Sequence, residues 1–347
     1  MTDEILPAVR AEHSFDAGRL ENWMQAHVAG FRGPLTVEQF RGGQSNPTFR
    51  LSTPQYRYVL RRKPPGPLLR GAHAVEREAR VMTALGTQKF PVPYVYGLCE
   101  DATVIGTPFF IMELIQGRIF WDATFPDVSS EDRPLYFDAM NQTIALLHGL
   151  DIAALGLENF GGRGNYFERQ ISRWSQQYLQ DEAVGRDVHM DRLIEWLPQH
   201  IPTSEEKSLI HGDFRCDNLV FDPTEPRVIA VLDWELSTVG HPLADFAYHL
   251  MMYRVPPLGI AGLLGADLRA LNIPSESRYV AAYCDRTGRR DIPQLNFYIA
   301  FNLFRFAGIL HGIRGRVLRG TAASSSAKDF SASFPLFART GWDAAQS

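Results

Sequence analysis

The stretch HGDFRCDNLVFDPTEPRVIAVLDWE, residues 211–235, carries the pattern that decides the fold. An apolar run ends just before it, and Asp213 and Asn218 then follow five residues apart. Residues 218–221 and 227–232 are apolar segments separated by a Pro- and Asp-rich turn, which is typical of a β-hairpin. The stretch therefore predicts a loop and a hairpin that display oxygen-bearing side chains at both ends.

The second predicted strand ends on Asp233, which completes a set of three such side chains. Phosphoryl transfer needs a carboxylate that orients or deprotonates the acceptor hydroxyl, and oxygen ligands that hold Mg²⁺ against the nucleotide phosphates. Asp213 fits the first role, and Asn218 and Asp233 fit the role of metal ligands. Each residue alone is equally typical of a turn, where Asp and Asn bond their own backbone. The prediction depends on all three occurring together.

The spacing HxDxxxxN, followed by an apolar strand and an Asp, resembles the catalytic loop and metal-binding Asp of the protein-kinase-like superfamily. The spellings HGDF and DWE, in place of HRDL and DFG, are similar to the aminoglycoside phosphotransferase and choline kinase branch. The whole chain most resembles the kinase-like domains associated with acyl-CoA dehydrogenases. This resemblance implies a two-lobed α+β fold, with a β-rich N-terminal lobe and a mainly helical C-terminal lobe, that uses ATP and Mg²⁺.

The bulk properties narrow the classes of partner. The chain has 347 residues, of which 45% are hydrophobic and 21% are charged, with a net charge of -4. A binder of nucleic acid normally carries a basic excess, so we expect no nucleic-acid partner. No run approaches the roughly eighteen apolar residues of a membrane span, and the N-terminus lacks the apolar core of a secretory signal. The three cysteines are isolated from one another, which favours a reduced, cytoplasmic setting.

The order of predicted elements indicates where one lobe ends. A helix is expected to begin near Asp16, and another to cover residues 72–85. Predicted strands cover residues 35–40, 47–52, 57–62, 94–98 and 108–114. Mostly helical patterns follow. We therefore predict a nucleotide-binding lobe with a leading helix over residues 1–116, and a catalytic and substrate-binding helical lobe over residues 117–347.

The turn between the first two strands is the candidate phosphate-binding loop. It contains Gly43, Gln44, Ser45 and Asn46. Glycine lets backbone amides approach phosphate oxygens, while Ser and Asn add side-chain donors. An ordinary hairpin turn uses the same residues, so the prediction depends on the position of this loop just before the strand YRYVLRRK.

That strand is expected to supply the cation that binds the nucleotide phosphates. Alternation places Val59, Arg61 and Lys63 on one face, and we assign Val59 and Arg61 to the nucleotide site. Kinases normally use Lys at the position of Arg61, so the sequence departs from the common pattern; Lys63 is the alternative. Glu78 lies on the core-facing stripe of the following helix and is predicted to pair with Arg61, whereas Glu76 faces solvent.

The segment FFIMEL, within residues 108–114, resembles the connector that bonds adenine through its backbone. Glu113 and Ile115 would offer those carbonyl and amide groups. The plain alternative is a core strand. Downstream, GHPLADFAYHL matches the family's GDPxxD segment, with His241 in place of the usual Asp, and Asp245 is expected to brace the catalytic loop through backbone hydrogen bonds.

Together these features predict a kinase that transfers the γ-phosphoryl group of ATP to a hydroxyl of a small molecule. Too few residues lie between Asp233 and the next helix to form a docking platform for a polypeptide substrate. Many arginines follow Asp245, which favours an acceptor with phosphate or carboxylate groups, and the resemblance points to a hydroxyacyl-CoA. Ordinary surface pairing would also explain these arginines. The alternatives are a nucleotide-binding pseudokinase that regulates a partner protein, and a scaffold that binds no nucleotide.

Overall fold

The computed structural model describes the chain except for residues 1–4, 7, 42–45, 67–72, 259 and 322–326. The chain divides into two compact units. The first comprises Met1–Ile119 and Asn218–Ser237, and the second comprises Phe120–Asp217 and Thr238–Ser347. The first unit is rich in strands and the second is mainly helical, as predicted. The hairpin at 218–237 thus belongs by its contacts to the first unit, while the functional division at residue 117 stays a prediction.

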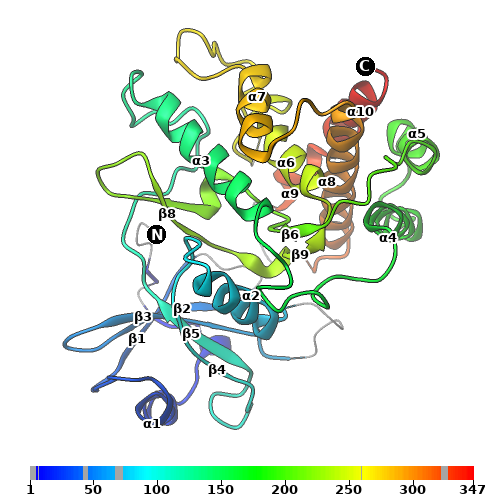
Figure 1. Ribbon diagram of the computed structural model, residues 1–347. Helices are drawn as coiled ribbons and strands as arrows, with labels where there is room; N and C mark the ends of the chain where they lie inside the picture. Colours follow the sequence, from blue (N-terminus) through cyan, green and yellow to red (C-terminus); the bar gives the residue numbers. More distant parts are fainter. Residues whose placement is uncertain (1–4, 7, 42–45, 67–72, 259, 322–326) are drawn as a thin grey trace. The chain divides into compact units, whose positions relative to one another are not determined.

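A five-stranded antiparallel sheet forms the body of the first unit, in the order β1-β2-β3-β5-β4 (Figure 1). Its strands are β1 (Thr36–Gln39), β2 (Thr48–Ser52), β3 (Arg57–Arg62), β4 (Val95–Cys99) and β5 (Phe109–Glu113). Each lies within a few residues of its predicted position. Strand β3 is the central strand and is buried from its second residue to its last. Because β2 and β5 pair with it on either side, its buried backbone N–H and C=O groups have hydrogen-bond partners.

One face of this sheet packs against α1 (Ala17–His27), as Leu20 and Met24 join a core with Phe49, Leu60 and Phe109. Asp16 caps the helix by accepting a hydrogen bond from the backbone of Arg19, as expected for the predicted start. Helix α2 (Val75–Thr87) contacts β4 and β5 and buries the predicted apolar stripe, Glu78 included. The acidic side chain therefore enters the interior of the unit.

The hairpin predicted after Asn218 consists of β7 (Leu219–Phe221) and β8 (Val228–Val231), which pair antiparallel. Gly117 lies against it so closely that a Cβ there would be 2.3 Å from the carbonyl oxygen of Phe221. Trp234, just after the hairpin, is buried against Phe90 and donates its indole N–H to Val231 O at 2.9 Å. These contacts attach the hairpin to the rest of the first unit.

The second unit is built around α8 (Leu295–Leu318), which packs against several other helices of the unit. The remaining helices are α3 (Arg133–His148), α4 (Tyr166–Gln180), α5 (Val188–Trp196), α6 (Pro242–Leu250), α7 (Glu276–Thr287), α9 (Ala327–Ala332) and α10 (Phe334–Ala345). The short strands β6 (Ser208–Ile210) and β9 (Thr238–Gly240) pair antiparallel, and β6 leads directly into the catalytic loop. In the described part of the chain, none of the helices combines the length and apolar character needed to span a bilayer.

Candidate active site

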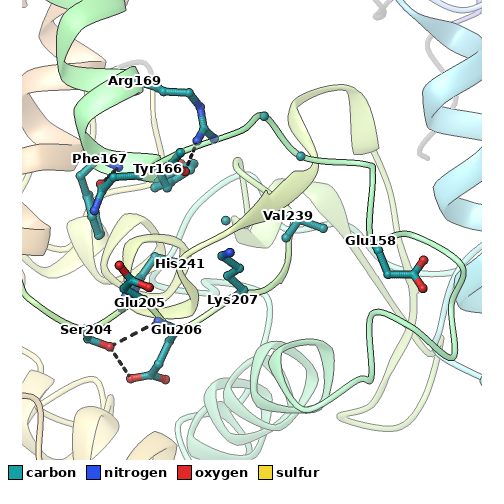
Figure 2. A pocket seen from close by; sticks show the side chains of 15 residues that line it. Glu158, Tyr166, Phe167, Arg169, Ser204, Glu205, Glu206, Lys207, Val239 and His241 are labelled. Carbon is teal, nitrogen blue, oxygen red and sulfur yellow. Dashed lines mark hydrogen bonds between the residues drawn. The ribbon is translucent and has the colours of Figure 1, made fainter.

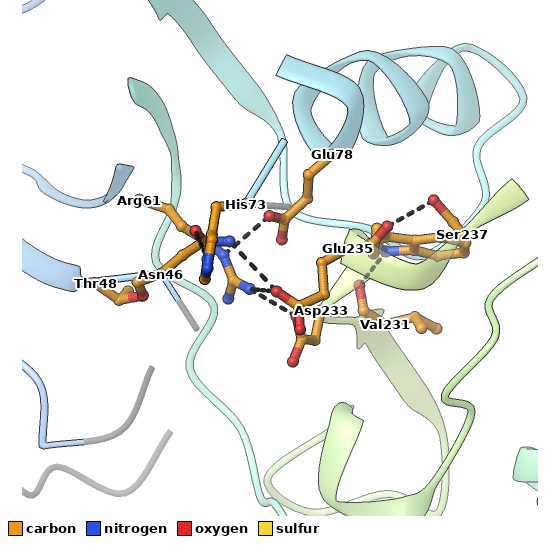
Figure 3. Close-up of polar contacts among 10 residues, drawn as sticks. Asn46, Thr48, Arg61, His73, Glu78, Val231, Asp233, Glu235 and Ser237 are labelled. Carbon is orange, nitrogen blue, oxygen red and sulfur yellow. Dashed lines mark hydrogen bonds and ion pairs between the residues drawn. The ribbon is translucent and has the colours of Figure 1, made fainter. Parts of the chain in front are cut away.

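A buried ion cluster lies at the centre of the candidate nucleotide site in the first unit (Figure 3). Arg61 Nε lies 2.9 Å from Glu78 Oε2, and Arg61 Nη2 lies 2.7 Å from Asp233 Oδ1 and 3.5 Å from Glu235 Oε2. Residues from β3, α2 and the end of the hairpin thus converge, although they are far apart in the sequence. The Arg61–Glu78 contact is the one expected from the helical stripe. Lys63, the alternative, pairs instead with Glu76 at 2.9 Å.

The electrostatics of the cluster follow from its burial. The side chain of Glu78 is 2% exposed, and burial raises its pKa to about 8, against the opposing effect of Arg61. Attraction to Glu78 and Asp233 outweighs burial at Arg61 and raises the pKa of its guanidinium, which stays charged. One cation therefore faces three carboxyl groups. This local acidic excess is what a divalent cation would neutralise.

Asp233 adopts an unusual backbone conformation, with φ at 64° in the left-handed region. Asp tolerates this conformation better than most residues, yet it is uncommon and clusters at functional sites. The turn ends β8 and starts the short 3-10 helix Trp234–Leu236, which contacts α2. The strain directs the carboxylate of Asp233 toward Arg61.

The fit of this site to Mg²⁺ rests on its donor chemistry. Asp233 offers a carboxylate, and its side chain is 34% exposed. Asn218 lies at the start of the same hairpin, where its backbone carbonyl oxygen accepts a hydrogen bond from Leu232 N. Within the described ranges, no group of three or more His, Cys, Asp or Glu side chains forms a metal cage. Mg²⁺ is usually held by one or two protein oxygens together with phosphates and water, so this sparse donor set fits the ion.

The predicted phosphate-binding loop is described only at its end, because Gly43, Gln44 and Ser45 lie outside the described residues. Asn46 is fully buried; its Nδ2 lies 3.4 Å from Glu235 Oε2 and its Oδ1 lies 3.2 Å from His73 Nδ1. The end of this loop therefore reaches the same ion cluster. No local sequence signal marks His73. Glu235 lies two residues after Asp233, a spacing that fits a site residue and a surface residue equally well.

The residues predicted to contact the base lie along β3 and β5. Val59 is buried and pairs in register with Met112, one residue before Glu113. The amide of Glu113 already donates to Tyr94 O at 2.8 Å, so a contact of Glu113 with adenine would use its carbonyl. Ile115 is half-buried, just beyond the strand. Their role in binding stays a prediction.

The catalytic loop itself belongs to the second unit and is braced by α6. Both oxygens of Asp245 accept backbone hydrogen bonds, from His211 N and Gly212 N, each at 2.8 Å. The expected bracing role of Asp245 is confirmed. His211 is buried and its Nδ1 accepts from Asp213 N at 3.2 Å, so its ring packs and hydrogen-bonds within the loop.

Asp213 is held by groups that the sequence pattern did not identify. Tyr248 on α6 donates its hydroxyl to Asp213 Oδ1 at 2.5 Å, and Arg215 Nε lies 3.2 Å from the same oxygen. Arg215 also pairs with Asp217 at 3.0 Å. Arg215 lies two residues after Asp213 in the quoted loop and Tyr248 lies three residues after Asp245, but neither position by itself indicates a contact with Asp213. Only the fold shows that both meet Asp213.

His241, which replaces the Asp of the GDPxxD segment that the sequence resembles, caps a helix. Its Nδ1 accepts from Leu243 N at 3.2 Å, so the imidazole caps the start of α6. The ring is buried and packs on Phe167 and Tyr298. Burial lowers the pKa of His241 to about 4, which keeps it neutral and able to accept this bond.

A separate pocket of about 270 Å³ lies in the second unit (Figure 2). It lies at the end of the β6–β9 pair that is opposite to the loop containing Asp213. It is lined by the loop before α4, the segment 204–207 and the end of β9. Ser208 pairs with Gly240 at this end, whereas the catalytic loop leaves β6 after Ile210. The lining mixes carboxylates (Glu158, Glu205) with cations (Arg169, Lys207). None of the predicted site residues lies in this pocket.

Comparisons with known proteins agree with the geometry. A model of the phosphotransferase enzyme family matches residues 36–295. The crystal structure of a putative aminoglycoside phosphotransferase from Ralstonia eutropha JMP134 is 50% identical, covers 96% of this chain and 99% of its own, and superposes with a TM-score of 0.88. An aminoglycoside phosphotransferase APH(4)-Ia mutant in complex with ADP and hygromycin B is 16% identical, with a TM-score of 0.60 over 93% of this chain and 97% of its own, which shows the shared fold.

Longer relatives contain the same region. Human acyl-CoA dehydrogenase family member 11 is 43% identical over 345 residues, which cover 97% of this chain and 44% of that protein. Mouse acyl-CoA dehydrogenase family member 10 is 43% identical over 90% of this chain and 29% of its own length. The chain therefore spans less than half of these relatives.

Proposed function

Because this chain belongs to the phosphotransferase enzyme family, we propose that it transfers the γ-phosphoryl group of ATP, with Mg²⁺, to a hydroxyl of a small molecule. The observation that carries the proposal is the convergence of Arg61, Glu78 and Asp233 in one buried cluster. Such an arrangement positions a cation for phosphates beside a carboxylate for the metal. The complex of a relative with ADP supports an adenine nucleotide as the donor.

Each residue has a role in this proposal. Arg61 binds the nucleotide phosphates and Glu78 orients it, while Asn46 contributes from the end of the phosphate-binding loop. Asn218 and Asp233 would hold Mg²⁺, which neutralises charge on the phosphates when bound. We assign nucleotide binding to residues 1–116 and catalysis with acceptor binding to residues 117–347. Asp213 accepts the proton of the acceptor hydroxyl as that oxygen attacks phosphorus.

The proposed acceptor rests more on similarity to known proteins than on the positive charge of the second unit's arginines. Several arginines that suggested an anionic acceptor are already engaged inside the second unit: Arg254 with Glu276, Arg286 with Asp138, Arg289 with Glu206 and Arg319 with Asp181. Their pairing weakens the argument from charge. The similarity to acyl-CoA dehydrogenase family members supports a hydroxyacyl-CoA as the acceptor to test first. The three cysteines are free and buried, which supports a cytoplasmic location.

The test is ATP turnover with Mg²⁺ against a panel of hydroxyacyl-CoAs and aminoglycosides, using the wild type and Asp213→Asn. We expect one class of acceptor to be phosphorylated, and Asp213→Asn to lower kcat by about 10²–10⁴-fold because it cannot accept the proton. Binding of Mg-ATP, measured by titration calorimetry, should persist in the variant. Full turnover by Asp213→Asn on a confirmed acceptor would contradict the assigned base.

The same experiment addresses the pseudokinase alternative. Tight binding of Mg-ATP without turnover of any acceptor would favour a regulatory protein, and absence of binding would favour a scaffold. Arg61 motivated the pseudokinase because it replaces the usual Lys. Its contacts with both Glu78 and Asp233 support a working nucleotide site instead.

A further inference from the structure

A hydrogen bond and an ion pair meet on one oxygen of the proposed catalytic carboxylate. Tyr248 Oη lies 2.5 Å and Arg215 Nε lies 3.2 Å from Asp213 Oδ1. The torsion that turns a carboxylate about its Cβ–Cγ bond is broad, so an Asp side chain has no strong orientation of its own. The hydrogen bond from Tyr248 on α6 and the ion pair with Arg215 of the loop therefore both restrain the plane of the Asp213 carboxylate.

The donor from α6 is itself tied to the loop it serves. Asp245, three residues before Tyr248 on the same helix face, accepts from the backbone amides of His211 and Gly212. The helix thus holds the backbone of the catalytic loop through one side chain and the carboxylate of Asp213 through another. Tyr248 is consequently set at a fixed distance from Asp213.

The ring of Tyr248 is also restrained. Tyr248 is 4% exposed, and the guanidinium carbon of Arg305 lies 4.9 Å from the centroid of its ring. Arg305 in turn donates through Nη2 to the carbonyl oxygen of Gly212 in the catalytic loop. Burial and the charge of Asp213 raise the pKa of Tyr248 well above its usual value, so the phenol keeps its proton and acts as a donor.

We propose that Tyr248 is a positioning residue for phosphoryl transfer, whose hydroxyl holds Asp213 in the orientation that receives the proton of the acceptor. This rests on the proposed function. In the step itself, the acceptor oxygen forms a bond to the γ-phosphorus, the bond from phosphorus to the bridging oxygen of ADP breaks, and the acceptor proton passes to Asp213. Tyr248 keeps its proton throughout and does not touch the reacting atoms.

The test compares Tyr248→Phe with Tyr253→Phe. Both changes remove one hydroxyl from a buried tyrosine of the α6 region, but Tyr253 donates to Pro274 O at 3.0 Å, away from Asp213. With an acceptor from the panel, Tyr248→Phe should lower kcat by about 10- to 100-fold and leave KM for Mg-ATP within about twofold. Tyr253→Phe should leave both near the wild-type values.

A second readout does not depend on turnover. Loss of the Tyr248 hydroxyl removes a hydrogen bond from Asp213 Oδ1, so the carboxyl ¹³C signal of Asp213, assigned with Asp213→Asn, should move at fixed pH in Tyr248→Phe and keep its wild-type position in Tyr253→Phe. The other polar groups around it are the same in both tyrosine variants: Arg215, Asp217, Arg305 and His211.

The outcomes separate the two proposals. If Tyr248→Phe matches Tyr253→Phe in kcat and in the ¹³C signal of Asp213, the positioning role is wrong. If that signal moves but the wild type phosphorylates no acceptor, Tyr248 orients Asp213 as inferred and the proposed phosphotransferase reaction fails instead.

Discussion

At the scale of single residues, the decisive feature is that one guanidinium joins two carboxylates. Arg61 uses Nε for Glu78 and Nη2 for Asp233, which are two different nitrogens of the same planar group. An ammonium presents its donors from one nitrogen and lacks this forked geometry. Arg at this position is therefore more than a substitute for the usual Lys, since it links the helix, the strand and the hairpin at once.

We expect Arg61→Lys to raise KM for Mg-ATP by about tenfold. The single nitrogen of a lysine ammonium cannot contact Glu78, Asp233 and the nucleotide phosphates at the same time. Arg50→Lys is the matched control. Arg50 lies on the neighbouring strand β2 and pairs with Glu38 at 2.9 Å, in a part-exposed ion pair. Steady-state kinetics of both variants would measure the difference. Equal KM values would show that Arg61 does not bind the nucleotide.

At the scale of elements, close approaches fix the loops that surround the helical core. Gly161, in the loop before α4, lies so near β9 that a Cβ would be 2.6 Å from the carbonyl oxygen of Val239. That contact is with backbone, which cannot rotate away. The loop can follow this path only without a side chain at position 161.

Gly161→Ala should therefore lower the free energy of unfolding by about 1–3 kcal/mol, as overpacking does in a tight interior. Gly86→Ala provides the opposite case, since Gly86 lies exposed in α2, where an added Cβ would meet no atom of the described residues within 4 Å. It should gain up to about 1 kcal/mol from helix propensity. Urea denaturation of both variants gives the comparison, and an unchanged midpoint for Gly161→Ala would contradict the packing argument.

The elements that could be predicted are those with a strong local period. Short apolar segments bounded by turn residues located all five strands of the first unit's sheet, and the helical stripe placed Glu78 inside. The three-residue strand β9 and the helix α10 went unpredicted. A strand of three residues is too short to show a period, and α10 contains Pro335 and Gly341, which obscure a helical pattern.

At the scale of the whole molecule, buried histidines make stability depend on pH. His249 is 2% exposed and its Nε2 lies 2.7 Å from Tyr279 Oη. Burial lowers the pKa of His249 from 6.5 to about 4. Protonation thus favours the unfolded chain, so the contribution of neutral His249 is fully present above pH 6.5 and is lost as the pH falls toward 4.

The acid-induced loss of stability should shrink in His249→Gln, by up to about 3 kcal/mol at pH 4, because Gln does not titrate. Unfolding free energies of both proteins, measured by denaturant titration from neutral pH down to about pH 4, check this. The two curves should converge as the pH falls. Parallel curves over the whole interval would show that His249 is not the group responsible.

Residues of the candidate site could be predicted only where they belong to one short sequence pattern. Asp213, Asn218 and Asp233 follow from one quoted stretch, and Asp245 from its spacing in the next. Tyr248 on α6 and Arg305 on α8 were not predictable, since their contacts with the catalytic loop join segments 35 and 93 residues apart. Such contacts depend on how the helices pack against one another, which the local spacing of apolar residues does not predict.

The interleaved path of the chain has an evolutionary consequence. The polypeptide leaves the first unit after Ile119 and returns to it for residues 218–237, which carry both proposed metal ligands, before leaving again. A gene fragment that ends at residue 119 would encode the sheet without Asn218, Asp233 or the Trp234 that packs on Phe90. Homologous genes could therefore exchange this unit intact only by recombining after residue 119 and on both sides of residues 218–237, which favours inheritance of the whole as one block.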